Sequence, residues 1–391
     1  MLDFDRLRSR FAQFGGWRLV WQYARMGVLW TGVMALVRCA LKGVSMKAAY
    51  PVITKKVDER LILRYRHILD DNKRRLLKER SESDGLMADD EGLDGCAVPK
   101  IVWFSWLQGM DKAPEVVRVC LASQKRHLPD YEFRTLDLDN YRQWVELPDY
   151  VVEKYRKGLI PQASFSDLLR LAVLKRYGGI WMDASVFCSG FGNEKLKARW
   201  DRIMRSEFMV FRYFRRGEKM PVGLSNWFIV AVPNQIVVSS ILDIVLAYWK
   251  DYDCLVDYYI FHLFLGLALH EFPAIEAKMP RENSFHSIML GDALARTFRQ
   301  DQWQDLIDSV SSLNPLPSPR PLQKGKGCNR SCSSLLTASL YGWRGIRVLA
   351  RVLRDGTALQ KGASDYNIWH QRSCYGCFGG DAPAGDEGNE K

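Results

Sequence analysis

The chain has 391 residues, 47% of them hydrophobic and 12% aromatic, enough to bury one large core of roughly 200 residues. This composition excludes disorder over most of the chain. The net charge of +11 lies in residues 1–80, which hold 18 Lys or Arg against 7 Asp or Glu, so the remaining chain is neutral overall. Nine scattered cysteines do not resemble a disulfide framework and favour a reducing compartment.

The N-terminal segment, residues 1–48, is basic and rich in aromatic side chains. Trp17, Trp21 and Trp30 lie among arginines, a pattern typical of a helix on an anionic membrane surface. Packing on the protein's own surface is the alternative. The longest uncharged apolar run, 26–37, is shorter than the ~18 residues that span a bilayer, and no signal-peptidase site follows it.

The next segments alternate between helical and extended patterns. Residues 57–80 predict a charged, mostly solvated helix, and residues 81–95 a linker. A strand over 101–106, a helix over 113–126 and a strand over 131–136 predict a parallel βαβ unit. The remaining predicted elements are strands over 208–211 and 227–231, helices over 236–248 and 258–270, and a proline-rich break over 314–321.

Residues 163–187 carry the strongest local pattern. An apolar stripe predicts a helix that Ser164 caps, with Asp167 in its first turn. The Gly178-Gly179 pair ends that helix, and a short apolar strand then delivers Asp183 at its carboxyl end. Ligands of open α/β sheets bind at such strand ends, so Asp183 is a candidate for a metal-bound diphosphate site.

Five motifs follow one another between residues 99 and 183: PKIVWFSW (99–106), PDYE (129–132), LPDY (147–150), FSDLLR (165–170) and GGIWMD (178–183). Together they resemble the capsular polysaccharide synthesis protein family and, more distantly, the DxD glycosyltransferases with a GT-A fold. Those distant relatives include mannosyltransferases and the large glucosylating bacterial toxins. The resemblance covers roughly residues 95–300.

The resemblance implies an α/β fold: a GT-A-like domain over 95–310 with a central, mostly parallel sheet flanked by helices. A basic membrane-surface segment and linker (1–94) would precede it, and an irregular extension of unknown role (311–391) would follow. The implied reaction moves a sugar from a nucleotide-sugar donor to a growing surface polysaccharide or a lipid-linked glycan, on the cytoplasmic face of the cell membrane. No general base stands out, which favours a retaining mechanism assisted by the leaving phosphate.

The same resemblance assigns roles to individual residues. Asp183 and Arg170 would be catalytic, with Asp183 matching the first carboxylate of DxD, and Arg170 would also face the donor. The other expected donor-binding residues are Trp103, Asp167, Gly179, Ser185 and Asn226. The residues alone leave alternatives open: Asp167 and Arg170 also suit a local i,i+3 ion pair, and Trp103 also suits the core, in which case Trp106 serves equally for base stacking.

The metal site is expected to draw on Asp183 and a small number of further ligands. A divalent cation, Mn²⁺ or Mg²⁺, is expected at Asp183, but Ser185 stands where many relatives carry the second acid, and a hydroxyl is a weaker ligand than a carboxylate. His262, near Asp257, is a second candidate ligand, with a core histidine as its alternative. A structural zinc ion is a further hypothesis for four cysteines: Cys328, Cys332, Cys374 and Cys377.

Two rival functions are compatible with the sequence. In the first, Ser185 marks lost chemistry, and the protein is a non-catalytic nucleotide-sugar-binding or scaffold subunit of a polysaccharide assembly complex. In the second, the basic segment binds nucleic acid, but a membrane surface explains that basicity as well, and no nucleic-acid partner is expected.

Overall fold

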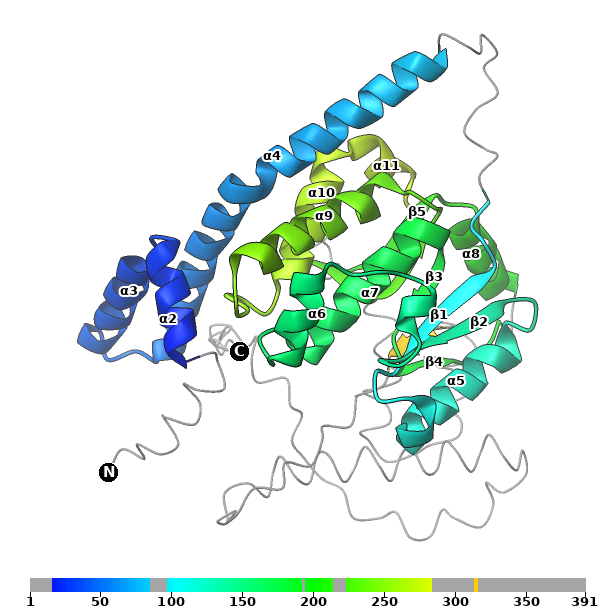
Figure 1. Ribbon diagram of the computed structural model, residues 1–391, viewed down its shortest axis with the longest axis horizontal. Helices are drawn as coiled ribbons and strands as arrows, with labels where there is room; N and C mark the ends of the chain where they lie inside the picture. The colour runs from blue at the N-terminus through cyan, green and yellow to red at the C-terminus, as the bar shows by residue number, and fades with distance from the viewer. Residues whose placement is uncertain (1–15, 85–96, 192–193, 214–222, 283–312, 316–391) are drawn as a thin grey trace, which may run out of the picture.

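A five-stranded sheet lies at the centre of the computed structural model, which describes residues 16–84, 97–191, 194–213, 223–282 and 313–315 (Figure 1). Its strand order is β2-β1-β3-β6-β5. The strands are β1 (Ile101–Ser105), β2 (Glu132–Leu136), β3 (Gly179–Met182), β5 (Phe208–Tyr213) and β6 (Gly223–Ala231). β1 pairs in parallel with β2 and β3, and only β6 runs against the other four. The predicted α/β fold with a mostly parallel central sheet is confirmed.

Helices flank this sheet. α5 (Glu115–His127) connects β1 to β2 and completes the predicted βαβ unit. α7 (Gln162–Tyr177), α9 (Ile236–Asp251) and α10 (Ile260–Glu271) form a second group, in which α9 packs on both others and α10 also contacts β6. The shorter helices are α6 (Asp149–Arg156), α8 (Glu194–Met204) and α11 (Pro273–Lys278).

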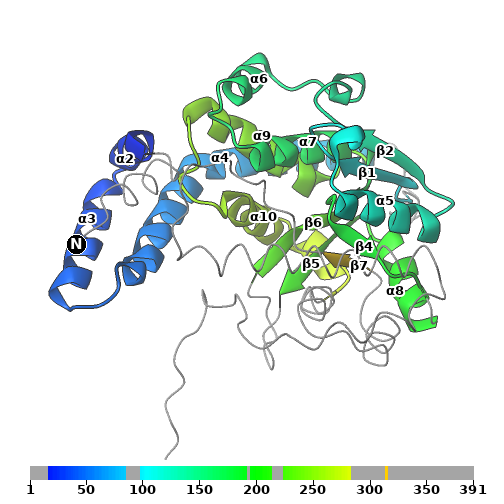
Figure 2. The same cartoon turned by 90° about the horizontal axis from the view of Figure 1, so that it is seen from below.

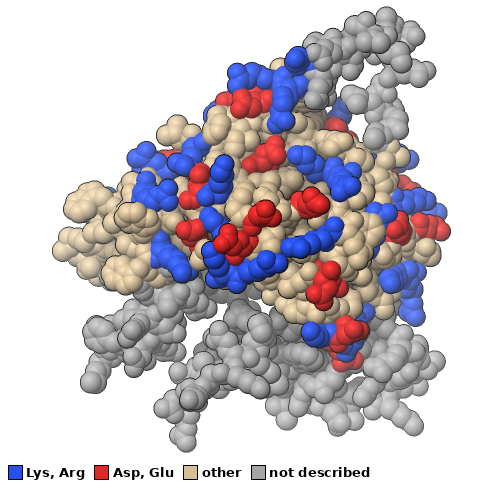
Figure 3. All heavy atoms as spheres, in the orientation of Figure 1, with Lys and Arg blue, Asp and Glu red and all other residues tan. Residues whose placement is uncertain are grey.

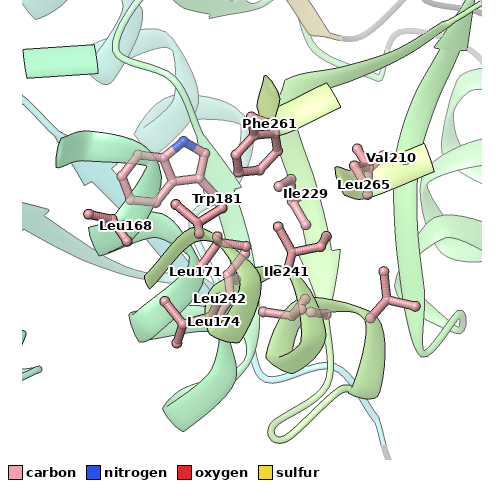
Figure 4. Packing of buried hydrophobic residues seen from close by; sticks show 14 of the residues in the cluster. Leu168, Leu171, Leu174, Trp181, Val210, Ile229, Ile241, Leu242, Phe261 and Leu265 are labelled. Carbon is pink, nitrogen blue, oxygen red and sulfur yellow. The ribbon is translucent and has the colours of Figure 1, made fainter. Parts of the chain in front are cut away.

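The largest hydrophobic cluster fills the space between this second group and the sheet. Figure 4 shows side chains of α7, α9 and α10, among them Leu171, Leu242 and Leu265, in one cluster with Val210 of β5 and Ile229 of β6. A smaller cluster joins Phe104 of β1 to α5. In both clusters the apolar face of a helix and the apolar face of the sheet cover each other and exclude water. This burial of apolar surface is the main favourable contribution to the free energy of folding.

α7 differs from the sequence prediction at its start. Pro161 precedes the first helical residue with φ −62° and ψ 151°, and no side chain caps the helix. Ser164 is therefore an internal, buried residue and not the cap, and Asp167 lies beyond the first turn. The prediction was wrong because Pro161, whose ring fixes φ at a value that suits helix entry, takes the cap position three residues earlier.

The Gly178-Gly179 pair makes the exit from α7 into β3 possible. Both residues have positive φ, 64° and 97°. A Cβ on Gly178 would lie 2.7 Å from Pro233, and one on Gly179 would lie 2.6 Å from the carbonyl oxygen of Ile101. Only glycine meets both requirements, so this turn fixes where β3 enters the sheet next to β1.

The N-terminal helices are α2 (Gly16–Arg25), α3 (Leu29–Leu41) and the 35-residue α4 (Tyr50–Asp84). α4 is less solvated than predicted, since it lies along α9 and α10 (Figure 1) and buries Val57, Leu61, Tyr65 and Leu69 at four-residue spacing. Figure 2 shows α2 and α3 at one end of the molecule. None of the described helices is by itself long and apolar enough to cross a membrane; α2 and α3 meet that test only as a pair, bent by 112°.

One short piece of the C-terminal region is described. Leu313–Pro315 forms β7, which pairs antiparallel with β4 (Val186–Cys188), just after Asp183. The proline-rich run therefore begins with a strand and not with a break. Residues 316–391, including the four candidate zinc ligands Cys328, Cys332, Cys374 and Cys377, lie outside the described residues.

We expect Gly179→Ala to destabilise the protein more than Gly109→Ala. Both glycines have positive φ, so both substitutions carry backbone strain of about 1–3 kcal/mol. Only Gly179 has backbone in the way, because a Cβ on Gly109 meets no atom within 4 Å. The overlap should lower the free energy of unfolding by about 1–3 kcal/mol more in the Gly179 variant. Denaturant unfolding measures this difference, and equal losses would contradict the steric argument.

Candidate active site

Asp183 lies where the sequence places it, directly after β3. Its backbone N–H donates to the carbonyl oxygen of Trp227 in β6 (2.9 Å), and its own carbonyl accepts from Val186 N–H (2.9 Å), which closes a turn into β4. Its carboxylate oxygen Oδ1 accepts from Arg170 Nη2 and from Trp181 Nε1, both at 2.7 Å. Within the described part of the chain, Oδ2 receives no hydrogen bond, and the side chain is 35% exposed. The carboxylate is thus held by one oxygen, and the other remains for a ligand.

Arg170 connects this carboxylate to α7. Its side chain is only 4% exposed, and its Nη1 lies 2.9 Å from Asp167 Oδ1. Two aromatic rings flank the guanidinium, with centroids 4.9 Å (Trp181) and 5.8 Å (Phe261) from Cζ, and Figure 4 shows these two side chains in the core. A buried guanidinium is stable when carboxylates and ring faces compensate its charge, as they do here.

Asp167 completes the network from the other side. Asn226 of β6 donates from Nδ2 to Asp167 Oδ1 (3.3 Å), although Asp167 and Asn226 are far apart in sequence. The pKa of Asp167 is raised to about 6, because burial and the nearby charge of Asp183 raise it by more than Arg170 and Asn226 lower it. The predicted residues Asp167, Arg170, Asp183 and Asn226 therefore form one group, contributed by α7, β6 and the end of β3.

His262 lies in the first turn of α10, next to this group. Burial, together with the positive charge of Arg170, lowers the pKa of His262 to about 4. The imidazole is therefore neutral near pH 7. Its Nδ1 is buried without a hydrogen-bond partner among the described residues. The Asp257 carboxylate makes its hydrogen bonds elsewhere and does not join His262 at this site. It accepts hydrogen bonds from Tyr50 OH (3.0 Å) and from the N–H of Tyr259 (2.7 Å).

Trp103 does not line this site. It is fully buried, its indole N–H donates to the Gly178 carbonyl (2.9 Å), and its ring packs against Trp144 and Tyr177, each 5.5 Å away. The alternative of a core tryptophan is what the structure shows, since residues 102–104 of β1 are all buried, with β2 on one side of the strand and β3 on the other. Trp106 is different: it is half-buried just beyond β1 and packs in the small cluster with Ala184, of the turn after Asp183.

Three further observations concern the predicted list. Ser185 is half-buried in the Asp183–Val186 turn, and Gly179 acts through the backbone as described above. The described residues contain no group of three or more His, Cys, Asp or Glu that could hold a metal ion.

Sequence reasoning missed Trp181, which orients Asp183. Its position two residues before Asp183 was a usable signal, because residues i and i+2 of a strand face the same side.

Asp167→Asn should flatten the dependence of stability on pH. The pKa of Asp167 is about 6 in the folded protein and 3.8 in the reference state, so its contribution is present below about pH 4 and lost as the pH rises through about 6. Urea unfolding of the wild type should show up to about 3 kcal/mol of such loss, which the variant lacks. Asp139→Asn, at an exposed position, should retain the wild-type slope. Equal slopes for wild type and Asp167→Asn would contradict the assignment.

Comparison with solved structures finds glycosyltransferases at low similarity. The PaToxG glycosyltransferase is 14% identical, with 73% of this chain and 97% of that chain covered and a TM-score of 0.32. A glycosyltransferase involved in the glycosylation of the major capsid of PBCV-1 is 11% identical (65% and 100% covered, TM-score 0.31). The galactosyltransferase LgtC, in complex with donor and acceptor sugar analogs, is 13% identical (63% and 99% covered, TM-score 0.30).

Comparison with protein sequences gives a clearer result. No curated protein matches the chain. Residues 55–316 match the sequence profile described as capsular polysaccharide synthesis protein, which is more than half of the chain. The matched region begins in α4 and contains the whole sheet, α7 and α10, and hence every residue of the Asp167–Arg170–Asp183 network. The chain belongs to the capsular polysaccharide synthesis protein family.

Proposed function

We propose that the protein is a glycosyltransferase that moves a sugar from a nucleotide-sugar donor to a growing surface polysaccharide or a lipid-linked glycan. The observation that carries this proposal is the half-exposed carboxylate of Asp183, which Arg170 and Trp181 hold by one oxygen at the end of a strand. A fixed carboxylate with a second, unoccupied oxygen suits a ligand that must be oriented before reaction. Membership of the capsular polysaccharide synthesis family supports the substrate class.

In this proposal each residue of the Asp167–Arg170–Asp183 network contacts or positions a different part of the donor. Asp183 faces the ribose and the diphosphate, while Asp167 accepts a hydrogen bond from a hydroxyl of the ribose or the sugar. Arg170 holds both carboxylates in place and supplies a positive charge close to the departing diphosphate, where negative charge develops. Asn226 fixes Asp167 from β6. Trp106, beside the turn that carries Ser185, takes the base-stacking role first assigned to Trp103.

The reaction itself follows from the donor chemistry. The acceptor hydroxyl forms a bond to the anomeric carbon while the bond from that carbon to the diphosphate oxygen breaks. The proton of the hydroxyl passes to the leaving phosphate oxygen, and the nucleoside diphosphate departs. Arg170 pairs with Asp167 and Asp183, the two carboxylates of the network, which is consistent with a retaining mechanism that uses no protein base.

A divalent cation is part of the proposal, and the donor set restricts how it would be held. The turn after β3 offers one carboxylate (Asp183) and one hydroxyl (Ser185), and the neutral imidazole of His262 lies near Arg170. Mg²⁺ and Mn²⁺ take most of their ligands from oxygen, so these residues fit a cation that the donor's diphosphate also ligates. When bound, the cation would neutralise charge on the departing diphosphate.

A non-catalytic nucleotide-sugar-binding subunit is the second candidate, and Ser185 is the observation that favours it. With one carboxylate instead of two, the site could bind a donor without turning it over. The two functions differ in a measurable way, since only the transferase releases nucleotide from the donor.

The second part of the proposal is that α2 and α3 attach the protein to the cytoplasmic face of the cell membrane. Trp17, Trp21, Trp30 and Leu41 are 64–83% exposed, and the end of the molecule that these helices form is mostly free of charged side chains (Figure 3). Residues 16–57 contain seven Lys or Arg and no Asp or Glu. Exposed indoles on a segment whose charged residues are all cations suit the headgroup region of an anionic bilayer.

Asp183→Asn should abolish most donor turnover. The neutral amide accepts hydrogen bonds from Arg170 and Trp181, and binds a cation, more weakly than a carboxylate, so nucleotide release from the accepted donor should fall by roughly 100-fold. Nucleotide release from a panel of nucleotide sugars, with and without Mn²⁺, measures this. Asp139→Asn is the matched control and should retain wild-type activity. If the wild type turns over no donor and Asp183→Asn changes neither binding nor release, the transferase function is refuted.

A triple variant, Trp17→Ser, Trp21→Ser and Trp30→Ser, should weaken membrane attachment. Loss of three interfacial indoles should reduce co-sedimentation with phosphatidylglycerol-containing vesicles by roughly tenfold or more. Leu77→Ser, at an exposed position near the far end of α4, is the control and should bind as the wild type does. Unchanged co-sedimentation of the triple variant would exclude this surface as the anchor.

A further inference from the structure

The loop between α9 and α10, residues 252–259, is held by the N-terminal helices. Tyr23 of α2 donates from its hydroxyl to the carbonyl oxygen of Val256 (3.0 Å). Tyr50, at the start of α4, donates to Asp257 Oδ2 (3.0 Å). These bonds join residues more than 200 positions apart in sequence. The loop is therefore part of the same end of the molecule as the proposed membrane-binding helices.

Two neighbouring tyrosines of this loop are exposed. Tyr258 is 72% and Tyr259 is 50% exposed, and Tyr50, which bonds to the residue before them, is 52% exposed. A tyrosine side chain combines an apolar ring with a polar hydroxyl, and this mixed character suits a lipid headgroup region. They extend the aromatic surface of α2 and α3 beyond those helices.

The same tyrosines lead toward the donor site. The rings of Tyr258 and Tyr259 contact edge to face (5.1 Å), and the ring of Tyr259 contacts that of His262 (5.6 Å). The positive charge of Arg170 contributes to the lowered pKa of His262. The ring of the neighbouring Phe261 lies over the Arg170 guanidinium, with 5.8 Å between the ring centroid and Cζ. A row of ring contacts thus runs from exposed surface to the residues that hold Asp183.

We propose that Tyr258 and Tyr259 lie in the membrane interface together with α2 and α3, and that the acceptor is a lipid-linked glycan presented from that interface. This inference rests on the transferase proposed above and narrows its acceptor. The occupant is a bilayer because the adjoining segment, 16–57, carries seven cations and no carboxylate, which complements anionic lipid. An acceptor anchored at this surface would reach the site along the tyrosines without leaving the membrane.

Photo-crosslinking in the full-length protein tests the location. p-Benzoylphenylalanine replaces Tyr258 in one variant and Leu77, exposed on α4, in the control. With phosphatidylcholine–phosphatidylglycerol vesicles, the probe at position 258 should crosslink to lipid at least several-fold more than the probe at position 77. Equal lipid crosslinking at the two positions, or a crosslink from position 258 to a second copy of the chain, would overturn the proposal.

A second experiment tests whether the acceptor is linked to a lipid, by following where a radiolabelled sugar goes after transfer. Membranes of the encoding organism are incubated with the protein and a radiolabelled donor sugar, and the product should partition into the organic phase. Label that is transferred but stays only in water-soluble glycan would overturn the inference while leaving the transferase intact. Absence of nucleotide release from every donor would instead refute the proposed function itself. Tyr258→Ser should retain donor hydrolysis, which shows that the variant is folded, and lose at least half of the organic-phase product.

Discussion

The buried guanidinium of Arg170 is the group on which the site depends. A charge that is 4% exposed is stable only if opposite charges and polarisable rings surround it, and the protein supplies Asp167, Asp183, Trp181 and Phe261. These partners come from α7, the end of β3 and α10. The requirement to satisfy one cation therefore fixes the relative position of three elements, and the position of the Asp183 carboxylate follows from it.

The same constraint explains the neighbouring residues. Trp181 serves twice, because its ring packs against Arg170 while its N–H binds Asp183 Oδ1. His262 is kept neutral by burial and by the same cation, so it can donate a lone pair but adds no charge. The Gly178-Gly179 turn is also necessary for the site, because it lets β3 follow α7 directly. As a result, Arg170 and Asp183 lie within hydrogen-bonding distance of each other.

The N-terminal helices belong to this arrangement and are not a separate appendage. α4 buries one face against α9 and α10, and Tyr65 packs edge to face on Tyr248 and Phe264. α2 and α4 also bind the loop that leads into α10. The proposed membrane surface and the donor site are therefore connected through the loop 252–259 and α10, so attachment to a bilayer would set the orientation of the site as well as its location.

The sequence alone determined the α/β class, the βαβ unit, the order of the main elements and the position of Asp183, because apolar periodicity and glycine placement are local properties. It also grouped Asp167 with Arg170, which are three residues apart on one helix. The tertiary structure decided the rest. Pairing of β3 between β1 and β6 brought Asn226 to Asp167, burial removed Trp103 from the candidate ligand surface, and the packing of α10 placed His262 and Phe261 beside Arg170. These are contacts between distant segments, and their geometry depends on how whole helices and strands pack, which no local pattern contains.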